Sequence, residues 1–173
     1  SLADILRLQH QINAHPLDQH LLHGAQTGRS LLMLEEPNLR AFLGAVDAAV
    51  RDYAGRLDAS DPVGRRRAER SRFTNLWSVR LRDKGFQPNH VHDRGWISSA
   101  YYVALTPAPS PREPRAGWLK LGEPSRPPPG CGPEAFVEPK EGLLVLFPSF
   151  MWHGTIPFEG DERLSLSFEV LPG

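Results

Sequence analysis

The sequence has a single cysteine, Cys131, so no disulfide can form within the chain. A lone thiol suits a reducing compartment, and we expect a cytoplasmic protein. No apolar run reaches the roughly 18 residues of a membrane span, and neither sign of charge is in excess, because 20 Lys and Arg balance 20 Asp and Glu. These absences argue against a membrane or nucleic-acid partner and favour a small molecule or a polypeptide.

The first third of the sequence has the apolar spacing of helices. The segment "LADILRLQHQI", from Leu2, places its apolar residues roughly on one face, and Pro16 is expected to stop this helix. A second helix is predicted to begin at Pro37 and to run to about Leu57, because apolar residues recur there at helical intervals. Both helices therefore need an apolar surface to cover.

From Ser71 onward the apolar period changes to two, which is typical of strands. Short strands separated by glycine and proline turns are typical of a β-sandwich, barrel or jelly roll. The proline-rich stretches 106–116 and 123–134 are expected to be loops that shape a binding site. Eight strands are predicted, at 72–82, 86–92, 97–105, 117–122, 134–138, 143–147, 151–156 and 163–170.

Two histidines lie close together in the segment "NHVHDRGW". His90 and His92 are two positions apart in a predicted strand, so their side chains point to the same face and could reach one metal ion. His153 is the only other histidine in the β-rich part, and it follows the apolar strand "GLLVLFPS". Imidazole ligands suit Fe, Zn, Cu and Ni. No metal role is expected for the other four histidines, His10, His15, His20 and His23.

The last predicted strand, "ERLSLSFEV", has one apolar and one polar face. If the apolar face packs against the helices, Arg163 and Ser165 point into the barrel. A buried guanidinium is costly unless an anion meets it, and its planar fork matches a carboxylate. Arg80, on the first predicted strand, could be a second anion contact or an exposed side chain.

Four motifs in this order, H-x-H, "WISSAYYV", "GLLVLFPSFMWHGTIPF" and "ERLSLSFEV", resemble the 2-oxoglutarate and iron(II)-dependent oxygenases. More narrowly, they are similar to the version at the C-terminal end of bacterial tetratricopeptide-repeat proteins, so the chain could be part of a longer protein. The resemblance covers about residues 15–171. It implies a mainly β fold, a double-stranded β-helix (jelly roll, cupin-like) of about eight strands with two N-terminal helices packed on one sheet. We expect one domain, 1–173, with a helical leader at 1–58 and the jelly-roll core at 71–171.

The resemblance also implies roles for particular residues. His90 and His153 take the two histidine positions of the iron site. Arg163, ten positions after His153, takes the position of the arginine that grips the far carboxylate of 2-oxoglutarate, and Ser165 that of the serine that assists it. Tyr102 falls on the metal side when positions are counted by twos from His92, through Trp96, which makes it a candidate donor to the co-substrate.

The sequence departs from the family pattern where the carboxylate ligand is expected. His92 stands at that position and Asp93 follows it. Either His90, His92 and His153 form a three-histidine site, which the spacing favours, or a bulge turns Asp93 inward and restores two histidines and a carboxylate.

The hypothesis that follows is an Fe(II)- and 2-oxoglutarate-dependent dioxygenase. It would hydroxylate an unactivated C–H bond of a peptide or protein side chain, or of a small metabolite, with O2 as co-substrate and release of succinate and CO2. One rival is a three-histidine cupin-type dioxygenase that works without 2-oxoglutarate and uses Arg163 for the substrate's own carboxylate. The other is a jelly-roll binding module without catalysis. A homodimer is compatible with each of them.

Overall fold

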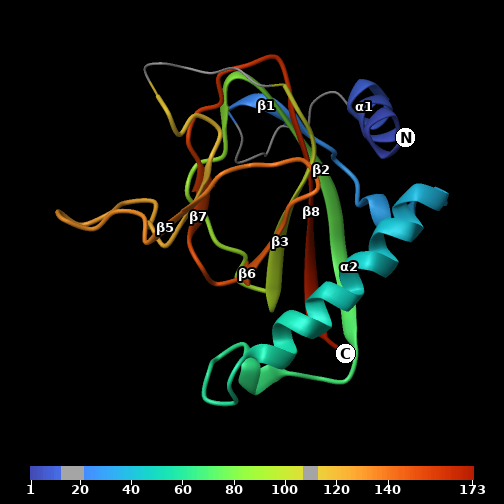
Figure 1. Cartoon of the computed structure of the whole chain (residues 1–173), viewed down its shortest axis with the longest axis vertical. Coiled ribbons are helices and arrows are strands. Elements are labelled where there is room, and N and C mark those ends of the chain that lie inside the picture. The colour runs from blue at the N-terminus through green and yellow to red at the C-terminus, as the bar shows by residue number, and fades with distance from the viewer. Residues whose placement is uncertain (13–21, 107–112) are drawn as a thin grey trace.

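The computed structural model describes residues 1–12, 22–106 and 113–173. Two antiparallel sheets face each other (Figure 1). The larger sheet has the strand order β1-β2-β8-β3-β6, and the smaller one has the order β5-β4-β7. The strands are β1 Leu22–Gln26, β2 Ser71–Phe86, β3 Ile97–Leu105, β4 Leu119–Leu121, β5 Ala135–Val137, β6 Leu144–Pro148, β7 His153–Thr155 and β8 Arg163–Pro172.

Both helices cover the outer face of the larger sheet, at the right of Figure 1. They are α1, Leu2–Ile12, and α2, Pro37–Arg56, and short 3₁₀ turns occupy Leu31–Met33 and Gly64–Arg66. The apolar side chains that these helices bury meet the outward residues of β8 in one core. That core contains Leu6, Leu39, Phe42, Val46 and Val50 from the helices and Leu164, Leu166, Phe168 and Val170 from β8.

The alternation along β8 decides what points into the barrel. Its apolar residues face the helices, so the residues between them, beginning with Arg163 and Ser165, face the smaller sheet. β8 is paired on both sides, with β2 and with β3, and is therefore held firmly in register. The strand thus fixes a row of polar groups inside a barrel whose other contents are largely apolar.

The architecture confirms the predicted mainly β class with two helices on one sheet, and also the predicted helix starts and the β8 pattern. The predicted strand at 86–92 is wrong, because β2 continues to Phe86 and the chain then forms one isolated bridge, between His90 and His153. Pro88 lies in this stretch and lacks the backbone donor that a ladder needs. β1 was not predicted.

Some expectations cannot be compared with the structure. Pro16 and most of the loop at 106–116 lie outside the described residues, whereas 123–134 is a loop as predicted. The division into a leader at 1–58 and a core at 71–171 stays a prediction. Within the described ranges, no helix combines the length and the apolar character needed to cross a membrane.

Candidate metal and co-substrate site

Three histidines meet inside the barrel. His90 and His153 exchange two backbone hydrogen bonds, of 2.9 and 3.0 Å, and the His92 N–H donates to the Ser149 carbonyl at 2.9 Å. One ring nitrogen from each of the three histidines lies within 4.8 Å of the others. His153 is buried, and the other two are half-buried. This distance is short enough for one metal ion to contact all three rings, and imidazole nitrogens suit iron.

The hydrogen bonds of the rings indicate which nitrogen each would offer to a metal. Nδ1 of His90 lies 2.8 Å from the Pro88 carbonyl, and Nδ1 of His153 lies 3.0 Å from the Met151 carbonyl. Nδ1 of His92 pairs with the carboxylate of Glu169. Because each of these partners accepts a hydrogen bond, Nδ1 carries the proton in all three rings, and Nε2 is the nitrogen suited to bind a metal.

The protonation of His153 suits a metal ligand. Burial, assisted by the neighbouring His90 and His92, lowers the pKa of this histidine to about 3, although the hydrogen bond to the Met151 carbonyl acts in the opposite direction. The ring is therefore uncharged at neutral pH, which is the form that coordinates metals.

Asp93 lies apart from the histidines. It is exposed, in a turn at residues 93–94, and it is not among the residues that converge. In the described part of the chain, the converging group contains histidines alone. The bulge that would turn Asp93 inward is replaced by this turn, so the geometry supports the three-histidine alternative.

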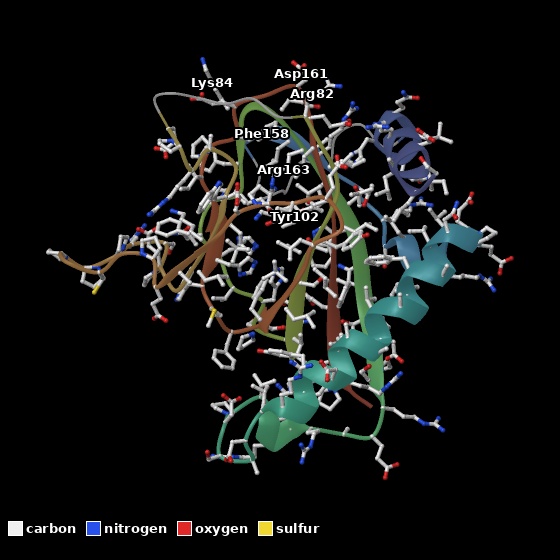
Figure 2. All side chains as sticks on the ribbon, viewed as in Figure 1. Arg82, Lys84, Tyr102, Phe158, Asp161 and Arg163 are labelled. Carbon is white, nitrogen blue, oxygen red and sulfur yellow. The ribbon has the colours of Figure 1, made fainter. Side chains whose placement is uncertain are left out.

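Arg163 lies deeper in the barrel, beside Tyr102 (Figure 2). It is 2% exposed, and its Nη2 donates to the Tyr102 hydroxyl at 3.3 Å. Its Nε and Nη1 are buried and have no hydrogen-bond partner among the described residues. Ser165, two positions along the same face, donates weakly to the Val79 carbonyl, at 3.4 Å. A ligand with two carboxylate oxygens would satisfy the orphaned guanidinium nitrogens.

The space between the histidines and Arg163 is small. About 20 Å³ is left among the lining side chains, which is room for about one water molecule. A five-carbon dicarboxylic acid can enter only if side chains move. The guanidinium carbon of Arg163 lies 4.9 Å from the centroid of the Tyr102 ring. The lining includes Trp77, Gln87, Ser99, Leu119, Phe147 and Ser167.

Two groups near the site were not predicted. Glu169 continues the inward row of Arg163 and Ser165, so the same counting by twos would have found it. The Trp77 ring lies beside the His92 ring, with centroids 5.6 Å apart.

The predicted inward position of Trp96 is wrong. Its ring lies in the core on the helix side of the sheet, and its indole N–H donates to the Val63 carbonyl at 2.9 Å. The prediction for Trp96 came from counting by twos from His92, and that count fails because the turn at 93–94 interrupts the extended backbone.

Arg80 is not in the histidine site. It lies on the outer face of the sheet, where its Nη2 is 2.7 Å from the carboxylate of Glu162. The same carboxylate accepts two hydrogen bonds from Arg7 of α1, at 2.6 and 3.0 Å. These contacts join α1 to Glu162, the residue that precedes Arg163 at the start of β8.

A known protein family matches much of the chain. The family model described as "Putative 2OG-Fe(II) oxygenase" matches residues 75–169, a little over half of the chain and the part that contains all three histidines and Arg163. No curated protein matches the chain.

Solved structures of low sequence identity share the fold. A Pseudomonas putida prolyl-4-hydroxylase is 20% identical, with a TM-score of 0.66 over 99% of this chain and 84% of that one. A Trichoplax adhaerens prolyl hydroxylase, solved with a hypoxia inducible factor peptide fragment, is 15% identical, with a TM-score of 0.64 over 98% and 76%. A viral collagen prolyl hydroxylase from Paramecium Bursaria Chlorella virus-1, in complex with 2OG, is 10% identical, with a TM-score of 0.60 over 99% and 89%. These likenesses confirm the jelly-roll fold.

Proposed function

Given that this chain belongs to the 2OG-Fe(II) oxygenase family, we propose that it hydroxylates an unactivated C–H bond of a peptide or protein side chain and releases succinate and CO2. Membership of the family makes it a 2-oxoglutarate-dependent non-haem iron dioxygenase, with Fe(II) as its metal and 2-oxoglutarate and O2 as co-substrates. The proposal concerns the residues that do this work and the substrate that is oxidised.

His90, His92 and His153 are proposed to hold the iron. The observation that carries this assignment is that one ring nitrogen from each of the three histidines lies within 4.8 Å of the others, while each Nδ1 has a hydrogen-bond acceptor. Iron(II), when bound, supplies the activation of O2, for which no amino-acid side chain is suited. Three neutral imidazoles leave the metal its charge of +2, which a doubly charged 2-oxoglutarate neutralises.

Arg163 is proposed to bind the far carboxylate of 2-oxoglutarate. Its support is the pair of buried guanidinium nitrogens, Nε and Nη1, that lack a hydrogen-bond partner in the described part of the protein. Tyr102, already in contact with Arg163, and Ser165, on the same face of β8, would add hydroxyl groups around that carboxylate. Because a fixed anion at this depth orients the rest of the molecule, the oxo-acid end would point toward the histidines.

The walls of the site are suited to exclude water. Leu119 and Phe147 line it, and the Trp77 ring shields His92 from one side. Exclusion of water strengthens the ionic contact of Arg163 with a bound carboxylate and limits side reactions of the activated oxidant.

A peptide or protein substrate is favoured by the neighbours of similar fold. The Pseudomonas putida and Trichoplax adhaerens proteins are prolyl hydroxylases, and the second was solved with a peptide. Proline residues of a polypeptide are therefore the first substrates to test, and free amino acids or other small metabolites are the second.

The experiment incubates the protein with Fe(II), 2-oxoglutarate and ¹⁸O2, together with a library of proline-containing peptides or with the free amino acids. We expect succinate in amounts equal to a product that is heavier by one ¹⁸O atom, with a peptide but not with proline alone. Arg163→Met is the matched variant and should form neither compound. Oxygen uptake without 2-oxoglutarate would support the cupin-type rival instead, and an absence of any oxygen uptake would support the binding module.

A further inference from the structure

Glu169 lies beside the proposed iron site without belonging to the converging group. It is on β8, on the inward face that also carries Arg163, and its carboxylate pairs with Nδ1 of His92. The two side chains are 17% and 20% exposed, so the pair is largely shielded from water. A hydrogen bond to a carboxylate in such a place is stronger than one on the surface.

The three histidines differ in the partner of Nδ1. His90 and His153 each donate to a backbone carbonyl, in both cases of the residue two positions earlier. These partners are neutral, and they are part of the local chain. His92 is paired instead with a full negative charge that comes from a strand 77 positions further along the sequence.

The backbone of Glu169 is held firmly. Its strand is paired on both sides at this position, with Asn75 of β2 and with Ser98 of β3, and its carbonyl accepts a hydrogen bond of 3.2 Å from the Thr74 hydroxyl. The carboxylate therefore projects from a rigid element, whereas His92 lies in the loop between β2 and β3. A rigid anion beside a ring on a loop can fix the orientation of that ring.

We propose that Glu169 is a positioning residue that holds His92 with Nε2 toward the metal and gives this ring part of the negative charge that a carboxylate ligand would supply. The inference rests on the proposed three-histidine iron site. A carboxylate that accepts the Nδ1–H bond increases electron donation from Nε2, which strengthens binding of a divalent metal and favours its trivalent form over the divalent one. Glu169 would in this way compensate for the lack of a carboxylate among the three ligands.

The test measures binding of Co(II) alone, by anaerobic titration followed in the visible spectrum. Glu169→Gln keeps the size of the side chain and removes its charge, and we expect affinity to fall by about 10- to 100-fold. Glu138→Gln, which removes a surface carboxylate that pairs with Lys140, is the matched control and should leave affinity unchanged. A thermal melt of each metal-free variant tests whether it is folded.

A double-mutant cycle with His92→Ala separates action through His92 from a general structural role. If Glu169 acts through His92, Glu169→Gln should add little to the loss already caused by His92→Ala. An equal further loss in the His92→Ala background would overturn the inference, because the two residues would then act independently. So would a mild effect of His92→Ala beside a severe effect of Glu169→Gln, which would make Glu169 a ligand itself.

The Fe(III)/Fe(II) midpoint potential of the iron-loaded protein is a second readout. If Glu169 had only a structural role, its substitution would not be expected to shift this potential in a defined direction. We expect Glu169→Gln to have a more positive potential than the wild type, and an unchanged or more negative potential would contradict the inference. If the wild type binds Co(II) and forms succinate while Glu169→Gln binds Co(II) equally well, the inference fails and the proposed function stands. If the wild type binds neither Co(II) nor Fe(II), both fail.

Discussion

Arg163 is costly to the fold without an anionic ligand. Two of its nitrogens are buried without a hydrogen-bond partner in the described residues, and the side chain is 2% exposed. A buried charge that lacks a full set of partners destabilises a protein, and an apolar side chain of similar size in its place is often neutral or stabilising. Stability given up at a single position in this way is typical of a binding site.

Arg163→Met should therefore raise the stability of the protein in the absence of 2-oxoglutarate while it abolishes binding of that acid. We expect a gain of about 1–3 kcal/mol in the free energy of unfolding, measured by urea denaturation, and no heat of 2-oxoglutarate binding in calorimetry. The control is Arg126→Met, in the exposed loop at 123–134, which should change neither quantity. A clear loss of stability in Arg163→Met would mean that the guanidinium is fully compensated in the ligand-free protein.

His10 gives the fold a dependence on pH. Its Nε2 lies 3.0 Å from the Ser78 hydroxyl, which itself donates to the Ser165 carbonyl, and burial, assisted by Arg80, lowers the pKa of His10 to about 4. The unfolded chain therefore takes up a proton near pH 6.5 that the folded protein refuses until about pH 4. The stability from this neutral histidine is complete above pH 6.5 and is lost between pH 6.5 and 4.

The prediction is that His10→Gln flattens this part of the pH profile. Metal-free wild type should lose up to about 3 kcal/mol more than the variant between pH 6.5 and 4, because each unit of pKa shift corresponds to about 1.4 kcal/mol. Urea denaturation at several pH values in that window measures the difference. Parallel profiles would show that His10 does not stay neutral in the folded protein.

The sequence indicated which residues form the site better than it indicated which other residues contact them. The spacing of His90 and His92 and the alternation around Arg163 are local patterns, and the structure brings these side chains to the places that the patterns indicate. Whether His92 or Asp93 points inward depends on the turn at 93–94. Counting residues by twos assumes an extended strand, so it cannot reveal where such a turn occurs. Glu169 was within reach of the same alternation, but its pairing with His92 depends on how β8 and a distant loop meet.

Strand β7 depends on a glycine at its centre. A Cβ atom at Gly154 would overlap the side-chain oxygen of Asn89 and lie 2.9 Å from the Gln87 carbonyl. Asn89 cannot easily yield, because its amide donates to Glu123 at 2.8 Å. The close approach that glycine permits is the same approach that lets His153 reach His90.

Gly154→Ala should accordingly move the two histidines apart. We expect a loss of about 1–3 kcal/mol in the free energy of unfolding, from overpacking, together with weaker Co(II) binding in a visible titration. Gly44→Ala is the matched control, since Gly44 is exposed within α2 and nothing lies within 4 Å of its added Cβ. That substitution should stabilise the helix by about 0.5–1 kcal/mol and leave Co(II) affinity unchanged. Unaltered Co(II) affinity in Gly154→Ala would show that the close packing of β7 is not needed to position the histidines.

Helix α1 is attached to the sheet through Glu162. Hydrogen bonds from Arg7 lower the pKa of this carboxyl; burial opposes the effect, and the charge of Arg80 assists it. Because the pKa in the folded protein lies below the ordinary value of 4.5, the pair contributes its full stability above pH 4.5. That contribution is lost as the pH falls through the lowered pKa.

Glu162→Gln should release α1 at neutral pH, as protonation of Glu162 is expected to do in the wild type at acid pH. Hydrogen exchange followed by mass spectrometry is expected to show faster exchange in residues 2–12 of the variant, with exchange in α2 unchanged. Glu141→Gln, at a surface carboxylate that accepts from the Leu105 N–H on the same sheet, is the control and should leave α1 protected. Equal protection of α1 in Glu162→Gln and the wild type would show that Leu6 and its apolar neighbours suffice to hold the helix.

The elements were predicted unevenly, for physical reasons. α1, α2 and β8 have long, regular apolar periods, and the structure confirms them. The predicted strand at 86–92 is interrupted by Pro88 and exists as one bridge, because its partner on the other side is a short strand of three residues. β1, with the sequence "LHGAQ", has too little β-branched or aromatic character to be recognised, and it is held by its pairing with β2.

The molecule as a whole is a jelly-roll barrel with its polar groups arranged by depth. The three histidines lie where the short sheet meets the loop before β3. Arg163 and Tyr102, which are more completely buried, lie side by side (Figure 2). A molecule with an oxo acid at one end and a carboxylate at the other matches this order. We therefore expect 2-oxoglutarate to bind by both ends at once, at the histidines and at Arg163.

Binding by both ends is tested by the visible spectrum of the protein reconstituted anaerobically with Fe(II), before and after addition of 2-oxoglutarate. We expect a weak charge-transfer band on addition of the acid. The band should be absent in His153→Ala, which removes a proposed ligand, and in Arg163→Met, which removes the carboxylate contact and should retain Fe(II). Binding of Fe(II) without a band in the wild type, or a band of full strength in Arg163→Met, would contradict binding by both ends.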